Sequence, residues 1–278
     1  MPLVNAKEML TKAKAGHYAV GQFNINNLEW TKSILLTAQE LNSPVILGVS
    51  EGAGKYMCGY KTVVGMVTAM LEELKITVPV ALHLDHGSTV KQAKDALAWG
   101  YTSVMYDGSR SSYEENVKWT KFVADYAHAL GATCEGEIGH VAQGDETALT
   151  DVDEAVSFAK GTGVDALAVS IGTAHGYYKA EPKLDIPRCA AIAESLPYTP
   201  LVLHGGSGTP LADVRRAIEC GIAKVNIATE FLDTYIKSTL KVYGDLNGGF
   251  VPPDKLADPI IDACAAHVQR LVKFFAGR

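Results

Sequence analysis

The sequence predicts a single-domain α/β protein of the (β/α)8, or TIM-barrel, class. Short β-branched or apolar runs alternate with longer segments of helical periodicity along the whole chain, which is typical of βα units repeated around a parallel sheet. Eight such runs can be counted, and 278 residues with 47% hydrophobic content suffice for one barrel. No proline- or serine-rich linker divides the chain, so we expect residues 1–278 to form one domain.

The expected elements alternate in chain order, because parallel neighbours need a crossover connection that is usually a helix. Each expected strand is a short run of mostly apolar residues, as strands buried on both faces require. We place the strands at Tyr18–Phe23, Pro44–Val49, Val80–Leu84, Ser103–Tyr106, Thr133–Ile138, Ala166–Ile171, Leu201–Leu203 and Lys224–Ile227. The helical period is seen at Glu29–Glu40, Lys61–Leu74, Tyr113–Leu130 and Leu211–Cys220, with a further helix at Asp258–Phe275.

Composition excludes several classes of function. The net charge of -6 argues against a nucleic-acid partner, because binding dominated by phosphates needs a basic face. We find neither an apolar signal core nor an apolar stretch long enough to span a bilayer, and therefore expect a cytoplasmic protein without a membrane partner. Five scattered cysteines indicate reduced thiols and no disulfide framework; they are Cys58, Cys134, Cys189, Cys220 and Cys264.

Three histidines follow expected strands directly: His86, His175 and His204. Taken singly, each is more often a hydrogen-bonded core or loop residue than a metal ligand. In a parallel barrel, however, all strands end at the same face, so the three imidazoles can converge on one ion. Three neutral imidazoles with an open fourth position are typical of catalytic zinc, although other divalent ions also suit them. The three together predict a catalytic metal centre.

Acidic residues lie at neighbouring strand ends. Asp85 precedes His86 and can move a proton to or from a substrate hydroxyl, or alternatively orient a ligand histidine. Asp107 and Glu137 end the fourth and fifth strands, where they can bind a second ion, offer an alternative metal position, or hydrogen-bond the ligand histidines. Glu135 shares the face of Glu137 by strand alternation and is a possible supporting residue.

Two further loops predict a phosphorylated substrate. Gly205-Gly206-Ser207-Gly208 and Asn226-Ile227-Ala228-Thr229 follow the seventh and eighth strands, where barrels of this type often hold phosphate on backbone amides. Lys179 can add a cation there or be solvated. The polar loop 140–147 is either a lid that closes over substrate or a plain surface loop.

These motifs together resemble the metal-dependent (class II) ketose-bisphosphate aldolases, the family of fructose-bisphosphate and tagatose-bisphosphate aldolases. The resemblance covers nearly the whole chain. The matching stretches are Gly21-Gln22-Phe23-Asn24, Ser50-Glu51-Gly52, His83-Leu84-Asp85-His86-Gly87, Gly172-Thr173-Ala174-His175-Gly176, Leu203-His204-Gly205-Gly206-Ser207-Gly208 and Lys224-Val225-Asn226-Ile227-Ala228-Thr229-Glu230.

The resemblance implies a lyase of carbohydrate metabolism and glycolysis, which cleaves a ketose 1,6-bisphosphate reversibly into dihydroxyacetone phosphate and glyceraldehyde 3-phosphate. It makes His86, His175 and His204 the Zn2+ ligands, with Asp107 and Glu137 at an alternative or second metal site. Asp85 becomes the acid/base acting on the C4 hydroxyl. Ser50 matches a contact near the aldehyde-side phosphate. The positions matching the dihydroxyacetone phosphate pocket are Gly176, Lys179, Gly205, Gly206, Ser207, Asn226, Ile227, Ala228 and Thr229. A homodimer or larger homo-oligomer and a monovalent cation near the phosphate are also implied.

The chain departs from the family pattern in three places. Family members carry a longer lid opening with Gly-Gly-x-Glu-Asp, and here Asp145 or Glu146 is the expected substitute for its proton-exchanging acid. Arg110 stands where the family commonly has a histidine, and the usual Gly-Ser tail is missing. Two alternatives therefore stay open: the same chemistry on a ketose phosphate with a distal sulfonate or carboxylate, which Arg110 would favour, and a non-catalytic aldolase-like subunit. The motifs favour neither C4 epimer.

Overall fold

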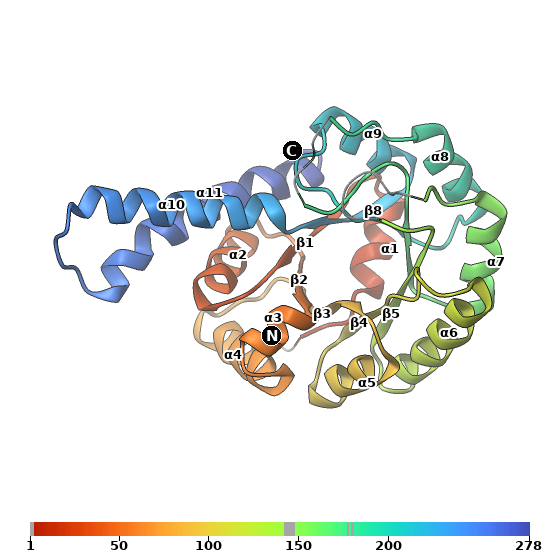
Figure 1. Cartoon of the computed structure of the whole chain (residues 1–278), viewed down its shortest axis with the longest axis horizontal. Coiled ribbons are helices and arrows are strands. Elements are labelled where there is room, and N and C mark those ends of the chain that lie inside the picture. The colour runs from red at the N-terminus through yellow and green to blue at the C-terminus, as the bar shows by residue number, and fades with distance from the viewer. Residues whose placement is uncertain (1–2, 142–147, 177, 179–180) are drawn as a thin grey trace.

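Eight parallel strands close into a barrel in chain order, and β8 returns to pair with β1 (Figure 1). The computed structural model describes residues 3–141, 148–176, 178 and 181–278. The strands are β1 (Val20–Asn24), β2 (Val45–Ser50), β3 (Val80–Gly87), β4 (Ser103–Tyr106), β5 (Thr133–Ile138), β6 (Ala166–Val169), β7 (Leu201–Leu203) and β8 (Ile222–Ile227). The predicted barrel is confirmed.

Five of the eight strands differ from the prediction at one or both ends, whereas β4, β5 and β7 have the predicted bounds. β2 lies one residue later at both ends, and β8 begins two residues earlier, at Ile222. β1 begins at Val20 instead of Tyr18, and β6 ends at Val169 instead of Ile171. β3 continues through Asp85 and His86 to Gly87, because Asp85 pairs with Ser50 of β2 and Gly87 pairs with Tyr106 of β4. Two of the most polar candidate residues are therefore part of the barrel wall.

Helices surround the barrel, and several begin where a polar side chain caps the first turn. Asn27, Thr89, Ser112 and Asp151 each accept a hydrogen bond from a backbone N–H of the helix that follows. The helices are α1 (Lys7–Ala15), α2 (Leu28–Glu40), α3 (Glu51–Tyr56), α4 (Tyr60–Glu73), α5 (Val90–Trp99), α6 (Tyr113–Ala129), α7 (Val152–Thr162), α8 (Ile186–Ser195), α9 (Leu211–Cys220), α10 (Thr229–Leu246) and α11 (Pro253–Phe275).

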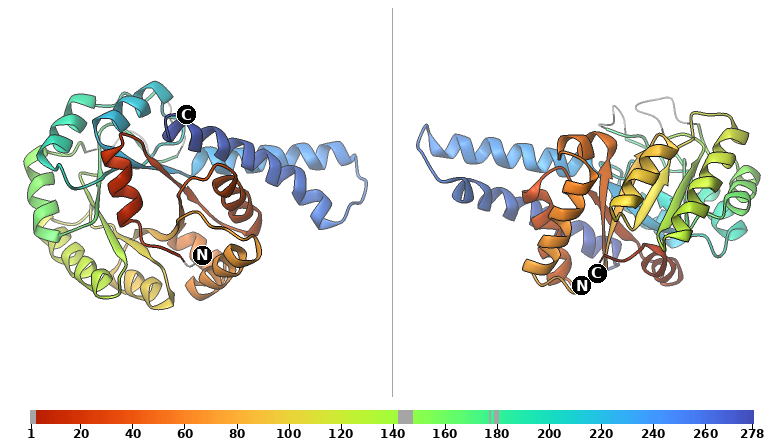
Figure 2. Two further views of the ribbon diagram at one scale, coloured as in Figure 1. Left: turned by 180° about the vertical axis from the view of Figure 1, so that it is seen from behind. Right: turned by 90° about the horizontal axis from the view of Figure 1, so that it is seen from below.

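Two apolar layers hold these elements together. The larger layer lies between the strands and the surrounding helices. The smaller layer fills the end of the barrel where the strands begin, and there α1 contributes Met9, Leu10 and Ala13. Seen from behind, α1 crosses this end of the barrel like a plug (Figure 2). The opposite end, where the strands finish, is left for the predicted site.

The last two helices extend away from the barrel as an arm (Figures 1 and 2). α11 packs along both α2 and α10, and it begins at Pro253, earlier than the predicted Asp258. None of the described helices is long and apolar enough to cross a membrane. The five cysteines are all free thiols.

Candidate active site and metal centre

An irregularity in β3 turns two consecutive residues toward the same cavity. Between Leu84 and Gly87 the register with β4 shifts, because β3 contains one more residue than β4 over this stretch. His86 adopts a left-handed backbone conformation, with a φ of 53°, which is costly for a residue with a side chain. The normal alternation is broken, so Asp85 and His86 both line the cavity.

Close packing of two loops brings the other histidines to His86. Gly205 has a φ of 63°, and a Cβ there would lie 2.4 Å from the carbonyl oxygen of Ala174. Only glycine fits this approach between the loops that follow β6 and β7. The ring of His86 lies 4.9 Å from that of His175 and 4.6 Å from that of His204, measured between centroids. One ligand atom of each histidine lies within 4.8 Å of the others.

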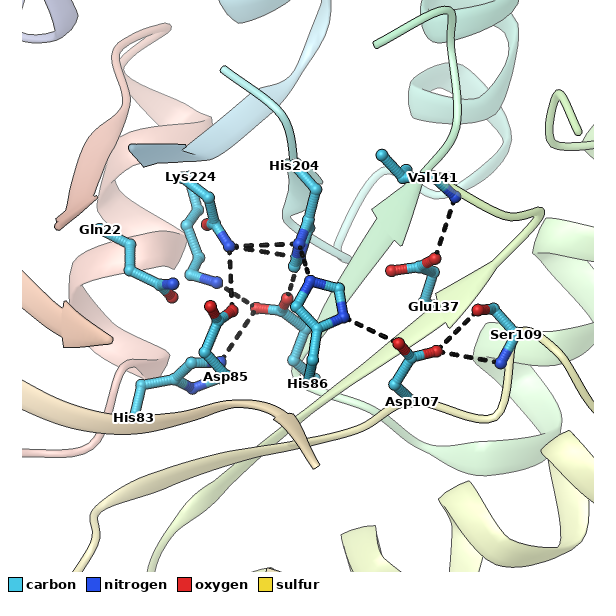
Figure 3. Close-up of polar contacts among 12 residues, drawn as sticks. Gln22, His83, Asp85, His86, Asp107, Ser109, Glu137, Val141, His204 and Lys224 are labelled. Atoms are coloured by element: carbon cyan, nitrogen blue, oxygen red, sulfur yellow. Dashed lines mark hydrogen bonds and ion pairs between the residues drawn. The ribbon is translucent and has the colours of Figure 1, made fainter. Parts of the chain in front are cut away.

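Hydrogen bonds determine which nitrogens of two histidines are free. Nδ1–H of His86 donates to Oδ2 of Asp107 at 2.8 Å, and Nε2–H of His204 donates to Oε1 of Glu135 at 2.8 Å. A carboxylate only accepts, so these two nitrogens carry the hydrogens of the neutral rings. The remaining nitrogens, Nε2 of His86 and Nδ1 of His204, face each other at 2.8 Å (Figure 3). Two lone pairs this close repel each other, and either a proton shared between them or a metal ion bound to both removes the repulsion.

Acidic surroundings favour positive charge at this point. Burial lowers the pKa of His86, but the charges of Asp85, Asp107 and Glu137 and the hydrogen bond to Asp107 outweigh it and raise the pKa to about 9. For His175, burial and the neighbouring histidines lower the pKa to about 3, so this ring is neutral. A proton or a metal ion satisfies the facing nitrogens, and the three-imidazole set fits a divalent ion with an open position.

A second group of donors shares His86 with the first. Ligand atoms of His86, Asp107 and Glu137 also lie within 4.8 Å of one another. Oε2 of Glu137 is buried without a hydrogen-bond partner among the described residues, although Oε1 accepts from the backbone N–H of Val141 at 3.2 Å. Burial raises the pKa of Glu137. An unpartnered buried carboxylate oxygen beside a metal centre is suited to an alternative ion position.

Two amides orient Asp85. Nδ2 of Asn24 donates to Oδ2 at 3.0 Å, and Nδ2 of Asn226 donates to Oδ1 at 3.3 Å. Burial alone raises the pKa of Asp85, but the charges of His86, His204 and Lys224 outweigh it and hold the pKa well below its usual range. Asp85 is therefore an ionised, oriented carboxylate that can accept a proton from a bound hydroxyl.

One cavity of about 660 Å³ joins this carboxylate to the predicted phosphate loops. α10 begins at Thr229, and its N-cap residue Ala228 provides no capping side chain, so first-turn amides are available for an anion. Oγ of Ser207 accepts from the backbone N–H of Ala228 at 3.2 Å and links the two loops. The predicted residues that line the cavity are Asp85, His86, Asp107, His175, Gly176, His204, Gly205, Ser207, Asn226, Ala228 and Thr229.

Some predicted residues do not line the cavity. The backbone N–H of Gly206 donates to the carbonyl of Asn226 at 3.1 Å, and Ile227 is buried in the apolar core, so both support the loops from behind. Ser50 caps α3 through the backbone N–H of Ala53 and pairs in register with Asp85. Lys179, Asp145 and Glu146 lie outside the described residues.

The cavity also contains residues that were not assigned a site role from the sequence. Asn24 ends β1 and was noticed only as part of a motif, although its place at a strand end was the same signal that singled out Asp107. Ser88, Ser111, His140 and Val141 come from loops after β3, β4 and β5. Oγ of Ser109 donates its only hydrogen to Oδ1 of Asp107 and therefore accepts a hydrogen bond from Nδ1–H of His140 at 3.0 Å. No local pattern marks these loop residues.

The model of the family described as fructose-bisphosphate aldolase class-II matches residues 4–277. This chain belongs to that family. Members are metal-dependent. A fructose-bisphosphate aldolase of Geobacillus stearothermophilus is 47% identical over 274 residues, which cover 96% of this chain and 95% of the relative. One from Staphylococcus aureus strain Mu50 is 46% identical over 283 residues, covering 99% of this chain and 98% of the relative. The predicted resemblance is confirmed.

Solved structures agree with the family assignment. The YdjI aldolase from Escherichia coli K12 superposes with a TM-score of 0.85 at 32% identity, covering 98% of this chain and 97% of that one. A putative fructose-1,6-bisphosphate aldolase from Coccidioides immitis gives a TM-score of 0.88 at 28% identity, covering 98% and 96%. Both superpositions extend over nearly the full length of this chain.

We predict that His83 makes the protein sensitive to acid. Burial, followed by the charge of Lys224, lowers the pKa of His83 to about 3, whereas the unfolded chain binds a proton near pH 6.5. Above pH 6.5 neither state is protonated. As the pH falls below 6.5 only the unfolded state gains the proton, so the free energy of unfolding decreases.

Urea denaturation at pH 7 and pH 5 without added metal measures this effect. The wild-type protein should lose about 2 kcal/mol more than His83→Gln over this interval, from one proton at about 1.4 kcal/mol per pH unit. Equal losses in the two proteins would show that His83 titrates normally in the folded state.

Proposed function

We propose that this chain catalyses the metal-dependent, reversible aldol cleavage of a ketose 1,6-bisphosphate to dihydroxyacetone phosphate and glyceraldehyde 3-phosphate. The observation that carries the proposal is the pair of facing nitrogens of His86 and His204, which lies in the same cavity as an oriented, ionised Asp85 and two phosphate-type loops. Family membership supports the same reaction.

The three histidines would hold the ion, which is zinc in class II aldolases. When bound, it stabilises the negative charge that develops on the substrate oxygens as the C3–C4 bond breaks. Nε2 of His86 and Nδ1 of His204 are the free ligand atoms, and the neutral ring of His175 is the third ligand. Asp107 and Glu137 would hold the ion in an alternative or second position.

Asp85 would move the proton on the C4 hydroxyl. Its carboxylate is ionised and held at both oxygens by Asn24 and Asn226, so it accepts that proton during cleavage and returns it during synthesis. We assign proton exchange at C3 to Asp145 or Glu146, in a segment outside the described residues.

The dihydroxyacetone phosphate portion would lie between the loops after β7 and β8. Ser207 and the amides of the first turn of α10 are the donors for its phosphate, and Gly176 and Gly205 line the same cavity. Gly206 and Ile227 support these loops from behind, and we place Lys179, which lies outside the described residues, beside the phosphate. We place Ser50 near the aldehyde-side phosphate and a monovalent cation beside the dihydroxyacetone phosphate group.

Removing the Asp85 carboxylate tests the proposal. Asp85→Asn keeps the side-chain shape, and we expect it to lower kcat for fructose 1,6-bisphosphate or tagatose 1,6-bisphosphate cleavage by about 10²- to 10⁴-fold. Zinc content should stay at the wild-type level. Wild-type activity should disappear with a chelator and return with zinc, followed through dihydroxyacetone phosphate formation.

Two results would contradict this reaction. Retention of more than a tenth of kcat in Asp85→Asn would remove the proposed base. No cleavage of either epimer by zinc-loaded wild-type protein would favour a different ketose phosphate or a non-catalytic subunit.

Arg110 favours a second candidate, the same chemistry on a ketose phosphate with another distal anion. Arg110 lines the cavity, and among the described residues it has no carboxylate partner. A guanidinium binds phosphate, sulfonate and carboxylate groups alike.

We predict that Arg110 recognises the distal anionic group. Arg110→Gln should lower kcat/KM for a ketose 1,6-bisphosphate about 10- to 100-fold, since a hydrogen bond to a charged group contributes about 1.5–3 kcal/mol. Fructose 1-phosphate lacks the distal phosphate and is the matched control, so its kcat/KM should not change. An equal loss on both substrates would show that Arg110 acts elsewhere. A higher kcat/KM of the wild-type protein for a distal sulfonate or carboxylate would select the second candidate.

We also propose that the chain forms a homodimer or a larger homo-oligomer. α10 leaves an apolar stripe exposed along the arm, formed by Leu232, Ile236, Leu240 and Tyr243. These residues are spaced at three or four positions and so lie on one helix face. Exposed apolar surface of this kind marks interaction sites, and a surface that pairs with its own copy closes an assembly.

Charge in the stripe should disrupt this assembly. We expect Leu240→Asp to shift sedimentation from an oligomer to a monomer at micromolar concentration, while Lys241→Ala, on the next residue, keeps the oligomer. A wild-type monomer, or an unchanged oligomer in Leu240→Asp, would overturn the assignment of this face.

A further inference from the structure

A buried ion pair lies beneath the metal centre, and the mechanism above leaves it without a role. Nζ of Lys224 on β8 and Oε2 of Glu135 on β5 are 2.6 Å apart, and their side chains are 1% and 3% exposed. β5 and β8 are not neighbours in the barrel wall, so the pair spans its interior. In Figure 3, Lys224 lies on the same side of the cluster as His83 and Gln22.

The pair is connected directly to one predicted metal ligand. Oε2 of Glu135 accepts a hydrogen bond from the ammonium group of Lys224, and Oε1 accepts one from Nε2–H of His204 at 2.8 Å. This bond keeps the hydrogen of the His204 ring on Nε2 and leaves Nδ1 free toward His86. With the hydrogen on Nδ1 instead, the same ring would present a donor to the ion and could not bind it.

Water is kept from the pair by the plug at the other end of the barrel. Ala6 and Leu10 face the small space that Glu135 and Lys224 also line. Ala6, Leu10 and Ala13 pack with strand residues in the inner apolar layer. In such surroundings a broken ion pair is costly, because the remaining charge has no solvent. The Glu135 carboxylate is thus held in one position and in its charged form.

We propose that Glu135 and Lys224 are positioning residues for the metal centre: Lys224 holds the Glu135 carboxylate, which holds His204 with its Nδ1 free for the ion. This inference rests on the proposed metal site and adds the device that prepares it. The competing explanation is a purely structural pair that joins β5 to β8 across the barrel.

A double variant separates the two explanations. Glu135→Leu combined with Lys224→Met removes both charges together, so no unpaired charge remains, and apolar replacement of such pairs often preserves stability. His204 nevertheless loses its acceptor. We expect zinc affinity, measured by competition with a chelator, to fall about 10- to 100-fold, as is typical when the partner of a ligand histidine is removed.

The tautomer of His204 provides a readout without metal. The imidazole 15N signals of His204 are assigned as those that are absent in His204→Gln. In the metal-free wild-type protein, their chemical shifts should be those of the Nε2–H tautomer. In the double variant we expect a mixture of both tautomers. Zinc saturation should restore most of kcat, because neither replaced side chain touches substrate.

Ser103→Ala is the matched control. It removes the bond between Oγ of Ser103 and Nδ1 of His83, at 2.7 Å, in the same buried layer but without a contact to His204. Its zinc affinity and His204 tautomer should equal those of the wild type.

Wild-type zinc affinity and an unchanged tautomer in the double variant would overturn the inference. An equal loss of affinity in Ser103→Ala would do the same, since it would indicate general loosening of the layer. If the double variant does not fold, Glu135→Met combined with Lys224→Leu, which also removes both charges together, is measured with the same two readouts. Failure of the wild-type protein itself to bind zinc would instead contradict the proposed function.

Discussion

The site depends on two carboxylates that determine which nitrogens of His86 and His204 are free. Asp107 accepts a hydrogen bond from Nδ1–H of His86, and Glu135 accepts one from Nε2–H of His204. The two remaining nitrogens, Nε2 of His86 and Nδ1 of His204, lie 2.8 Å apart. Neutral imidazoles would repel each other in this arrangement. A cation removes the repulsion, and the acidic surroundings that raise the pKa of His86 act in the same direction. The proposed metal centre would therefore have its ligand atoms oriented before any ion binds.

The barrel supplies the rigidity for this arrangement. His86 belongs to the irregular end of β3, whereas the loops of His175 and His204 meet where Gly205 allows backbone contact with Ala174. The Asp85 carboxylate is fixed by amides from β1 and β8, which adjoin each other at the closure of the barrel. The groups proposed for proton transfer and for charge stabilisation are thus held by the same barrel wall, as catalysis by preorganised groups requires.

The fold was largely predictable because each βα unit has a local sequence pattern, a short apolar run followed by a segment of helical periodicity. Apolar runs such as Val80–Leu84 and Leu201–Leu203 lie at strands of the structure. The three histidines could be grouped because parallel strands end together. The extension of β3 could not be predicted, because Asp85 and His86 are polar and the apolar pattern ends at Leu84. The position of α1 across the end of the barrel depends on tertiary packing, which the hydrophobic periodicity of the sequence does not reveal.

Contacts across the barrel were the least predictable part of the site. Glu135 is 89 positions from Lys224 and 69 from His204, so only closure of the barrel makes it a partner of both. The motif that contains Ser50 matches the family, but it did not reveal that the Ser50 hydroxyl caps α3 through the backbone N–H of Ala53. Sequence motifs identify residue types well, whereas the side-chain direction is decided by register.

Anomalous diffraction at the zinc absorption edge, from crystals grown with zinc, tests the central claim most directly. The account predicts one dominant peak bonded to Nε2 of His86, Nδ1 of His204 and a ring nitrogen of His175, with Asp107 and Glu135 still bonded to the opposite nitrogens. A peak away from these three rings, or zinc bound to Nδ1 of His86 or Nε2 of His204, would contradict it.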